Sequence, residues 1–520
     1  MNFKIIGLFL IAFIFIGVMC ESCNLQSTAE EQMAKKYCSS CHLFPEPSLL
    51  DKTTWEKNIL PAMAPKLGIR YFLDSPYEAD KYLKGNNVND SSLEVISISD
   101  WKKIISYYTD QAPQTNAGQN RQPLQKFTDH FTTKEVFPKD SNASVTYIKI
   151  DEGNKWIYTG NAADSSLDIY DEKLQLLSKY NIHGIVVDMQ FNESMKNIGA
   201  RSGILTNIGI MNPNDLSTGT ADSFHINKAG TVDYLKQFLK DMPRPVQTTM
   251  IDLDHDGKQD YLVNGFGNTR GALYWMKSNG NDQYQQNFIR ALPGAIKTYT
   301  GDYNHDELPD IMTLMAQGQE GIYLFTNKGN GNFETKTILA FPPVYGSSYF
   351  ELDDFNKDGH PDILYTCGDN ADYSRSVLKN YHGVYIFMND GKDNFTQQFF
   401  FEIHGCYKAI AKDFDNDGDL DIATISFFPD LKNQPQESFV YLENKGNSQV
   451  GNRFQFEPYC IKEFNAGNWL TMDAGDIDGD GDEDIVLGNF IVPEKELRTQ
   501  GKARPSFLLL ENKTKAVLTK

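Results

Sequence analysis

Basic residues are few in this chain of 520 residues: 49 Lys and Arg stand against 69 Asp and Glu, which gives a formal net charge of −20. Broad binding to nucleic acid requires cationic side chains that displace counterions from phosphate, so this balance argues against that class of protein. Cysteine is also scarce, and four of the seven lie close together near the start of the chain: Cys20, Cys23, Cys38 and Cys41. Their clustering indicates local chemistry rather than a framework of disulfides.

Signatures of common enzyme classes are absent as well. We find no nucleophile elbow, P-loop or dinucleotide-binding fingerprint, and we assign no catalytic residue from the sequence. The chain does contain 40% hydrophobic residues, 12% aromatic residues and 39 glycines, which suits a turn-rich β protein with a buried core. At about 100–200 residues per domain, the length predicts two to four domains.

The first twenty residues predict export. Lys4 precedes an apolar run from Ile5 to Met19. This run of about 15 residues is shorter than the roughly 20 needed to span a bilayer and suits the core of a signal peptide. We therefore interpret residues 1–20 as a signal peptide and expect the protein in the periplasm or on the cell surface; an uncleaved anchor is the alternative. Cys20 stands where a bacterial lipoprotein carries its acylated cysteine, which leaves an outer-membrane lipid anchor open.

Residues 38–42 read Cys-Ser-Ser-Cys-His, the C-x-x-C-H pattern of c-type haem attachment. Cys38 and Cys41 lie one helical turn apart, so both thiols can add to the vinyl groups of the porphyrin, and His42 can then ligate the iron. The alternatives are a disulfide or half of a zinc site. A zinc site needs two further ligands nearby, and the next histidine is His130.

A second axial ligand for the iron is expected downstream of the motif. Met63 ends the segment Leu-Pro-Ala-Met, and Pro61 should break a helix so that Met63 projects from an extended loop. Met33 is the competing methionine. Ligation by histidine and methionine leaves no iron position open for substrate and favours electron transfer.

A helix is expected over residues 98–108, with Ser99 as its N-cap and apolar residues at Trp101, Ile104, Ile105 and Tyr108. This segment resembles the C-terminal helix of small class I c-type cytochromes, and the resemblance rests mainly on the CSSCH and LPAM motifs. It implies a mostly α-helical cytochrome c-like domain over residues 28–112 that carries covalent haem c. A polar linker, residues 113–124, follows it.

Five acidic loops lie beyond the linker, at residues 252–260, 302–310, 354–362, 413–421 and 476–484. Their starts are 50 to 63 residues apart, and a repeat of this length predicts a propeller or a solenoid. In each loop the side chains at positions 1, 3, 5 and 9 can converge on one ion. Because every donor is an oxygen and the loop is flexible, Ca²⁺ is expected rather than Mg²⁺.

The expected ligands of these calcium ions, about four to five in number, are Asp252, Asp254, Asp256, Asp260, Asp302, Asn304, Asp306, Asp310, Asp354, Asn356, Asp358, Asp362, Asp413, Asp415, Asp417, Asp421, Asp476, Asp478, Asp480 and Asp484. Glycine at position 6 permits the tight turn in four loops, whereas Glu307 occupies that position in the second. An EF-hand would close with glutamate at position 12 and continue into a helix. Here position 9 closes the loop and strand-like residues follow.

Each loop therefore joins two strands, and apolar strands that end in Asn and a glycine turn follow at 322–329, 384–391 and 440–446. This pattern, together with Phe266-Gly267 and Pro293-Gly294-Ala295, resembles the FG-GAP/VCBS repeats of integrin-α-like β-propellers. The resemblance implies an all-β seven-bladed β-propeller over residues 125–520.

Two further blades, without an acidic loop, are expected at residues 145–181 and 184–240. A strand from 125–137 or 515–519 is expected to close the ring. The acidic loops would share one face of the propeller and leave the opposite face for recognition. Three long loops should border that second face, at 368–382, 427–437 and 489–505, and long loops are uncommon without function. They offer Asn370, Tyr381 and Arg498 to a polar or glycan ligand.

These features predict an exported protein in which haem c transfers electrons while the propeller binds a redox partner or a glycan or protein ligand. One alternative is a cell-surface binding lipoprotein in which haem is secondary. Another is a propeller enzyme, either a dehydrogenase or a calcium-dependent polysaccharide lyase. With five tryptophans, the chain lacks the tryptophan-rich blade repeats of quinoprotein dehydrogenases. Neither nucleic-acid binding nor membrane contact beyond a lipid anchor at Cys20 is expected.

Overall fold

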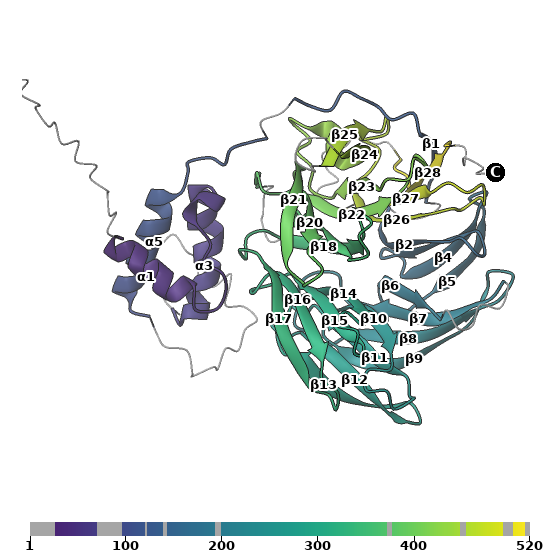
Figure 1. Ribbon diagram of the computed structural model, residues 1–520, viewed down its shortest axis with the longest axis horizontal. Coiled ribbons are helices and arrows are strands. Elements are labelled where there is room, and N and C mark those ends of the chain that lie inside the picture. Colours follow the sequence, from purple (N-terminus) through teal and green to yellow (C-terminus); the bar gives the residue numbers. More distant parts are fainter. Residues whose placement is uncertain are drawn as a thin grey trace, which may run out of the picture.

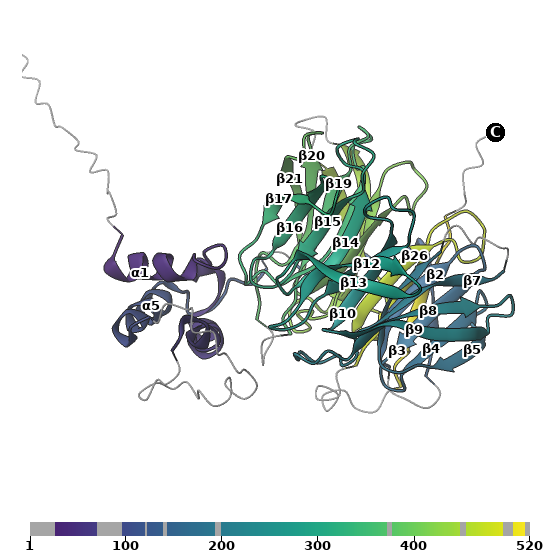
Figure 2. The ribbon, with the colours of Figure 1, turned by 90° about the horizontal axis from the view of Figure 1, so that it is seen from below.

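The computed structural model describes residues 27–69, 96–119, 122–138, 143–192, 199–371, 377–447, 454–491 and 503–514. It consists of a seven-bladed β-propeller and a group of helices beside it (Figures 1 and 2). The expected signal peptide, Cys20 and Arg498 lie outside the described residues. Within those ranges, no helix is both long and apolar enough to cross a bilayer.

Every blade is a four-stranded antiparallel sheet. The first three blades are β2 (Val145–Asp151), β3 (Trp156–Asn161), β4 (Ser166–Asp171) and β5 (Leu176–Asn181); β6 (Val186–Phe191), β7 (Arg201–Asn207), β8 (Gly219–Ile226) and β9 (Val232–Met242); and β10 (Pro245–Ile251), β11 (Asp260–Gly265), β12 (Ala272–Gly280) and β13 (Gln283–Arg290). The next three are β14 (Ala295–Gly301), β15 (Asp310–Met315), β16 (Gly321–Asn327) and β17 (Phe333–Ala340); β18 (Ser347–Asp353), β19 (Asp362–Cys367), β20 (Gly383–Asn389) and β21 (Phe395–Glu402); and β22 (Cys406–Lys412), β23 (Asp421–Ser426), β24 (Phe439–Asn447) and β25 (Phe454–Cys460).

The seventh blade closes the ring with strands from both ends of the propeller. It contains β26 (Trp469–Gly475), β27 (Asp484–Asn489) and β28 (Phe507–Asn512), and β1 (Phe131–Val136) pairs antiparallel with β28. The predicted count of seven blades, the two blades without acidic loops and a closing strand within 125–137 are therefore confirmed.

The burial of the strands follows their place in the blade. β19 and β27 are buried along their whole length, because a strand covers each edge and a neighbouring blade covers each face. The outermost strands, such as β13, keep much of their length exposed. All seven inner strands also have a register shift between their first and third residues. Such a bulge increases local twist and re-aims the residues that follow it.

The helical unit contains α1 (Ala29–Cys38), η1 (Pro47–Leu49), α2 (Lys52–Thr54), η2 (Trp55–Ile59), α3 (Leu60–Met63), η3 (Ala64–Leu67) and α5 (Ile98–Gln111). The predicted helix at 98–108 is thus present, with Trp101, Ile104 and Tyr108 buried. The predicted cap at Ser99 is wrong. Ser97 is the N-cap, because its hydroxyl accepts a hydrogen bond from the Asp100 N–H at 3.0 Å.

The expectation that Pro61 places Met63 on an extended loop is also wrong. Residues 52–67 form one continuous helical segment whose pitch changes along its length, and η2 is a π-helical turn in which the Leu60 N–H donates to Trp55 O. A proline lacks an N–H and clashes with the carbonyl four residues earlier in a regular α-helix. The wider turn before Pro61 relieves this conflict and keeps Met63 on a helix.

The helical unit docks on the propeller. Val344, Val377 and Tyr381 join the hydrophobic core of the helices. The Tyr381 hydroxyl donates to Leu49 O at 3.2 Å, and the Asn116 side-chain amide donates to Leu378 O at 2.6 Å. These propeller residues lie in the β17–β18 and β19–β20 connections, on the face opposite the acidic loops.

Part of the face predicted for recognition is therefore covered by the chain itself. Asn370 is 3% exposed and Tyr381 is 8% exposed. The Asn370 amide donates to Val377 O at 3.1 Å, within the same loop. The expectation that these two side chains face an external ligand is wrong, because the loop folds inward to hold the helices.

We expect Val377→Asp to release the helical unit from the propeller. Val377 is 2% exposed. A carboxylate without a partner in that apolar contact would cost more than the roughly 2–7 kcal/mol of a neutral polar group that lacks a hydrogen bond. Small-angle X-ray scattering of the full chain should show a larger radius of gyration, and the linker should be cleaved faster by protease. Leu431→Asp is the matched control, because Leu431 is 62% exposed on the same face. Equal scattering curves for both variants and the parent would contradict this docking.

Candidate calcium and haem sites

The five acidic loops connect the first and second strands of the third to seventh blades, so all of them lie on one face. In each loop the aspartate at position 1 accepts hydrogen bonds from the backbone N–H groups at positions 5 and 6. Asp413 does so from Asp417 at 3.0 Å and from Gly418 at 2.9 Å. These bonds curl the loop so that its side chains turn inward.

The aspartate at position 9 begins the second strand and is buried in every loop. Asp484 accepts from Ile477 N at 3.1 Å and from Asn512 N at 2.8 Å. Burial raises the pKa of Asp484 to about 7, opposed by these two bonds and assisted by the nearby carboxylates of Asp478 and Asp480. A divalent cation would offset this repulsion.

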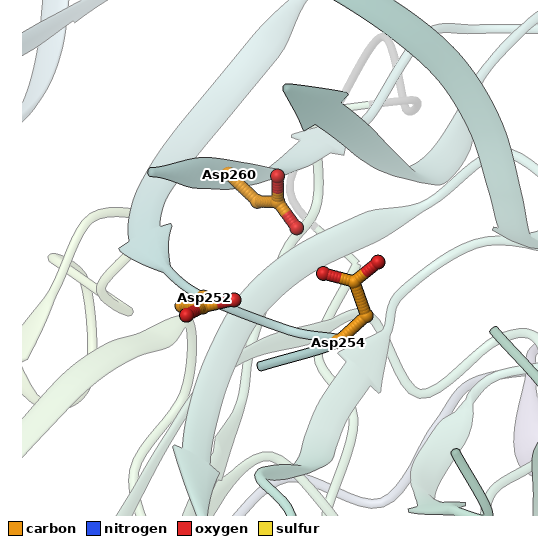
Figure 3. A group of neighbouring side chains, drawn as sticks. All are labelled: Asp252, Asp254 and Asp260. Carbon is orange, nitrogen blue, oxygen red and sulfur yellow. The ribbon is translucent and has the colours of Figure 1, made fainter. Parts of the chain in front are cut away.

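Three loops each bring together three of the four aspartates that the spacing singles out. Oxygens from three aspartates lie within 4.8 Å of one another in each group: Asp252, Asp254 and Asp260; Asp413, Asp415 and Asp417; and Asp476, Asp478 and Asp484. Figure 3 shows the first group directed toward one space. The clustered oxygens match the donor set of a hard cation such as Ca²⁺.

The other two loops have asparagine at position 3, and fewer carboxylates converge there. The amides of Asn304 and Asn356 donate to Asp306 and Asp358 at 3.0 and 2.8 Å. In the second loop Glu307 adopts φ 69°, close to the φ of 80–96° of the glycines at this position in the other loops. The turn is therefore preserved without glycine, at the cost of a left-handed conformation that a side chain disfavours.

Lysines that the sequence patterns did not single out contact these loops. Lys277 on β12 forms an ion pair with Asp254, and Lys258 pairs at 2.8 Å with Asp256, which is not part of the first group. Lys155 donates to Asp478 O from the neighbouring first blade. Lys277 and Lys155 lie outside the loops that they contact, so motif spacing cannot reveal them.

The haem-attachment motif lies where α1 ends. Cys38 is the last residue of α1, Cys41 is exposed and His42 is half-buried. The His42 Nδ1 atom lies 2.9 Å from Leu43 O. Since a carbonyl only accepts, Nδ1 carries the proton and Nε2 is left as the metal-binding nitrogen.

The surroundings of the motif suit a haem. Cys38, Met33 and Met63 are all partly buried and pack against the same hydrophobic core. Burial raises the pKa of Cys38 to about 11, although a hydrogen bond with the Tyr108 side chain lowers it in part. The Cys38 thiol and the thioethers of Met33 and Met63 thus border one apolar core, and His42 follows within the same motif. These residue types fit the group that the motif implies.

A further set of titratable residues lines the axis of the propeller. Six of the seven inner strands place a charged residue at their third or fifth position: Lys149, Asp188, Lys297, Glu351, Lys408 and Asp473. Lysines from three other blades act electrostatically on Asp188, which shows that the side chains converge. Burial lowers the pKa of Lys408 to about 8 and, with Asp353, raises the pKa of Glu351 to about 7.

Comparison with known proteins agrees with the loop geometry. A model of the FG-GAP-like repeat matches residues 252–313, 302–365 and 413–487, and these segments include all five acidic loops. The chain therefore contains FG-GAP-like repeats, arranged here on a seven-bladed β-propeller.

Cartilage acidic protein 1 of Xenopus tropicalis is 30% identical over 182 residues, which are 32% of this chain and 25% of that protein. The chain thus matches only a quarter of the length of this relative. Among solved structures, the Dos1 propeller aligns with a TM-score of 0.42 and 9% identity over 73% of this chain and 83% of the other. The BBS1N chain solved in complex with ARL6DN aligns with a TM-score of 0.41 and 7% identity over 75% and 97%.

Proposed function

We propose that this protein is an exported electron-transfer protein that holds haem c in its helical unit and calcium in the acidic loops of its propeller. The observation that carries the proposal is the geometry at residues 38–42. The two cysteines and the histidine follow one another at the end of α1, and the bond from His42 Nδ1 to Leu43 O leaves Nε2 for a metal.

Four residues would hold the haem: Cys38 and Cys41 through thioether bonds, and His42 and Met63 as axial ligands. Haem so bound supplies one-electron redox chemistry. The helical core provides apolar surroundings that exclude water from the ring. Leu43 is exposed directly after the axial histidine, which gives a redox partner an apolar contact beside the motif.

Calcium in the acidic loops has a structural role in this proposal. The loops join the inner strand to the second strand of each blade. In the seventh blade, Asp484 is anchored by the backbone N–H of Ile477 in the loop and by that of Asn512 at the end of β28. An ion at this junction would bind only the folded state and stabilise it by mass action.

The propeller's binding role falls to the part of the opposite face that the helices leave uncovered. Large apolar side chains with 40% to 62% exposure lie in connections on that face: Phe137, Ile210, Leu216, Leu292 and Leu431. These side chains would offer apolar contacts to a protein partner. The second candidate function, a cell-surface protein-binding lipoprotein, rests on the same observation.

The test of the proposed function is spectroscopic. Protein made in cells with haem-attachment machinery should show a reduced c-type spectrum that survives denaturation. Met63→Ala should then abolish the sulfur-ligand absorption band and lower the reduction potential, because axial ligands set haem potentials over a range of about 0.8 V. Met33→Ala is the control and should leave both unchanged. If the absorption band is lost in Met33→Ala and kept in Met63→Ala, Met33 is the axial ligand and our assignment of Met63 is wrong.

A further inference from the structure

Two histidines lie buried beside the loop that holds the helical unit. His382 ends the β19–β20 connection, and His404 lies in the β21–β22 connection. They are 0% and 2% exposed, and their rings stack with centroids 5.4 Å apart and an interplanar angle of 19°. Neither residue belongs to the proposed haem or calcium sites.

The hydrogen bonds of the pair fit uncharged rings. The Gly405 N–H donates to His382 Nδ1 at 3.3 Å, so this nitrogen carries no proton. Neither ring nitrogen of His404 has a hydrogen-bond partner among the described residues. An added proton would therefore face the Gly405 N–H on one ring and lack an acceptor on the other, and a buried charge without a partner is costly.

The charges around the rings do not compensate for their burial. Burial lowers the pKa of His404 to about 4; Asp430, in the β23–β24 connection, opposes this, and Lys379 lowers the pKa further. Burial also lowers the pKa of His382 well below its usual range, with Lys379 and His404 acting in the same direction and the Tyr345 backbone opposing them. Both rings are therefore neutral while they stay buried.

The linker closes over the pair. Gln119 lines a small cavity together with His404 and Glu402, and this cavity has room for about one water molecule. The Gln119 amide donates to Glu402 O and to a carboxylate oxygen of Glu437 in η5 (Pro435–Ser438), both at 3.3 Å. These two glutamates are the further acidic groups packed here. Hydration of a charged His404 thus requires the linker to lift.

The segment that ends in His382 also carries the docking contacts. Within residues 377–382, Val377 and Tyr381 join the core of the helical unit, and the Leu378 carbonyl accepts a hydrogen bond from the linker. The Tyr381 ring lies edge-on to the ring of His382, with centroids 5.6 Å apart. A displacement of His382 would therefore be passed directly to the residues that hold the helices.

We propose that His382 and His404 form an acid-sensitive latch, in which protonation of the pair releases the linker and segment 377–382, and with them the helical unit, from the propeller. The inference goes beyond the proposed function and depends on neither haem nor calcium. Release would uncover the apolar contact made by Val344, Val377 and Tyr381.

The direction of the pH dependence follows from the neutral rings. The docked state holds them uncharged, whereas exposed imidazoles take up protons near pH 6.5. Docking is thus strongest above about pH 6.5 and weakens as the pH falls toward the docked-state pKa of His404, about 4. His404 alone should reduce the ratio of docked to released chains about 30-fold between about pH 8 and about pH 5.

Small-angle X-ray scattering of the full chain in excess calcium tests the latch. On acidification the radius of gyration of the parent should rise to that of Val377→Asp. The double variant His382→Asn/His404→Leu should stay compact, because asparagine can still accept from the Gly405 N–H and leucine does not titrate. His183→Leu is the matched control: His183 lies in the corresponding β5–β6 connection but is exposed, so this variant should open like the parent. Opening of the double variant at the same pH as the parent, or a parent that stays compact, would overturn the inference.

A measurement on the unsubstituted protein decides the matter if the double variant fails to dock at neutral pH. In nuclear magnetic resonance spectra of isotope-labelled histidine, the signals of His382 and His404, assigned from the two single variants, should remain those of neutral rings until the radius of gyration increases. They should then change together with it. Protonation of either ring in a chain that stays compact would contradict the latch, whatever the outcome of the haem and calcium tests.

Discussion

Replacement of both Cys38 and Cys41 by alanine is expected to abolish covalent haem attachment completely. Each thioether needs one thiol, and without either bond the haem is held only by its axial ligands and is lost on denaturation. The measurement is haem-stained gel electrophoresis, with the absorption spectrum of the denatured protein, after expression with haem-attachment machinery. We expect full staining for the parent and none for the double variant.

The control for this substitution is Cys460→Ala, which removes a buried free thiol from the propeller instead. It should keep the parent's staining. Loss of haem from the double variant should also destabilise the helical unit. The buried core of this unit is small, and the haem would supply a large apolar surface to it. A colourless parent with Cys38 and Cys41 free would contradict the haem proposal.

The propeller could be predicted from the sequence because the motifs that specify each blade are short and recur along the chain. Each acidic loop and the strand after it lie within a few residues, so the spacing of one blade could be checked against four others. The haem motif was visible because it is local too, as its thiols and imidazole fall within five residues. The closing strand was predicted from the architecture instead: a ring of four-stranded blades needs a partner for β28, although β1 lies far from β28 in the sequence.

Contacts between distant segments could not be predicted in this way. Tyr381 lies in a long polar loop and has the character of a surface residue, yet its hydroxyl bonds to Leu49 O, more than 300 residues away. His382 and His404 lie in two separate connections, and their stacking depends on how those connections pack, which spacing alone does not specify.

Local geometry also departed from the simple rules in two places. Pro61 was expected to end a helix, but a π-helical turn absorbs it. Ser99 was expected to be a cap, but Ser97, two residues earlier, reaches the free N–H of the first turn. In both cases more than one residue or turn type satisfies the same physical requirement, and tertiary packing selects between them.

Removal of calcium is expected to lower the melting temperature of the propeller by about 2–8 °C. With free calcium between Kd and ten times Kd, each site contributes roughly 0.4–1.4 kcal/mol, so five sites contribute about 2–7 kcal/mol. For a propeller of this size, a change of about 1 kcal/mol in the free energy of unfolding shifts the melting temperature by about 1.2 °C. Differential scanning calorimetry in excess calcium and in chelator gives the shift directly.

Single substitutions in different loops should lower the melting temperature by different amounts. Asp415→Ala and Asp478→Ala each remove a carboxylate from a group whose oxygens lie within 4.8 Å, so each should lower the melting temperature in calcium by about 0.5–2 °C. Asp306→Ala should lower it less, because its loop has Asn304 in place of a carboxylate and Glu307 in a left-handed turn. In chelator the first two variants should not be destabilised, since burial raises the pKa of Asp415 to about 6 and Asp417 adds repulsion that alanine removes. Three variants that melt alike, with chelator and without it, would show that the acidic loops stabilise the propeller by some means other than a bound cation.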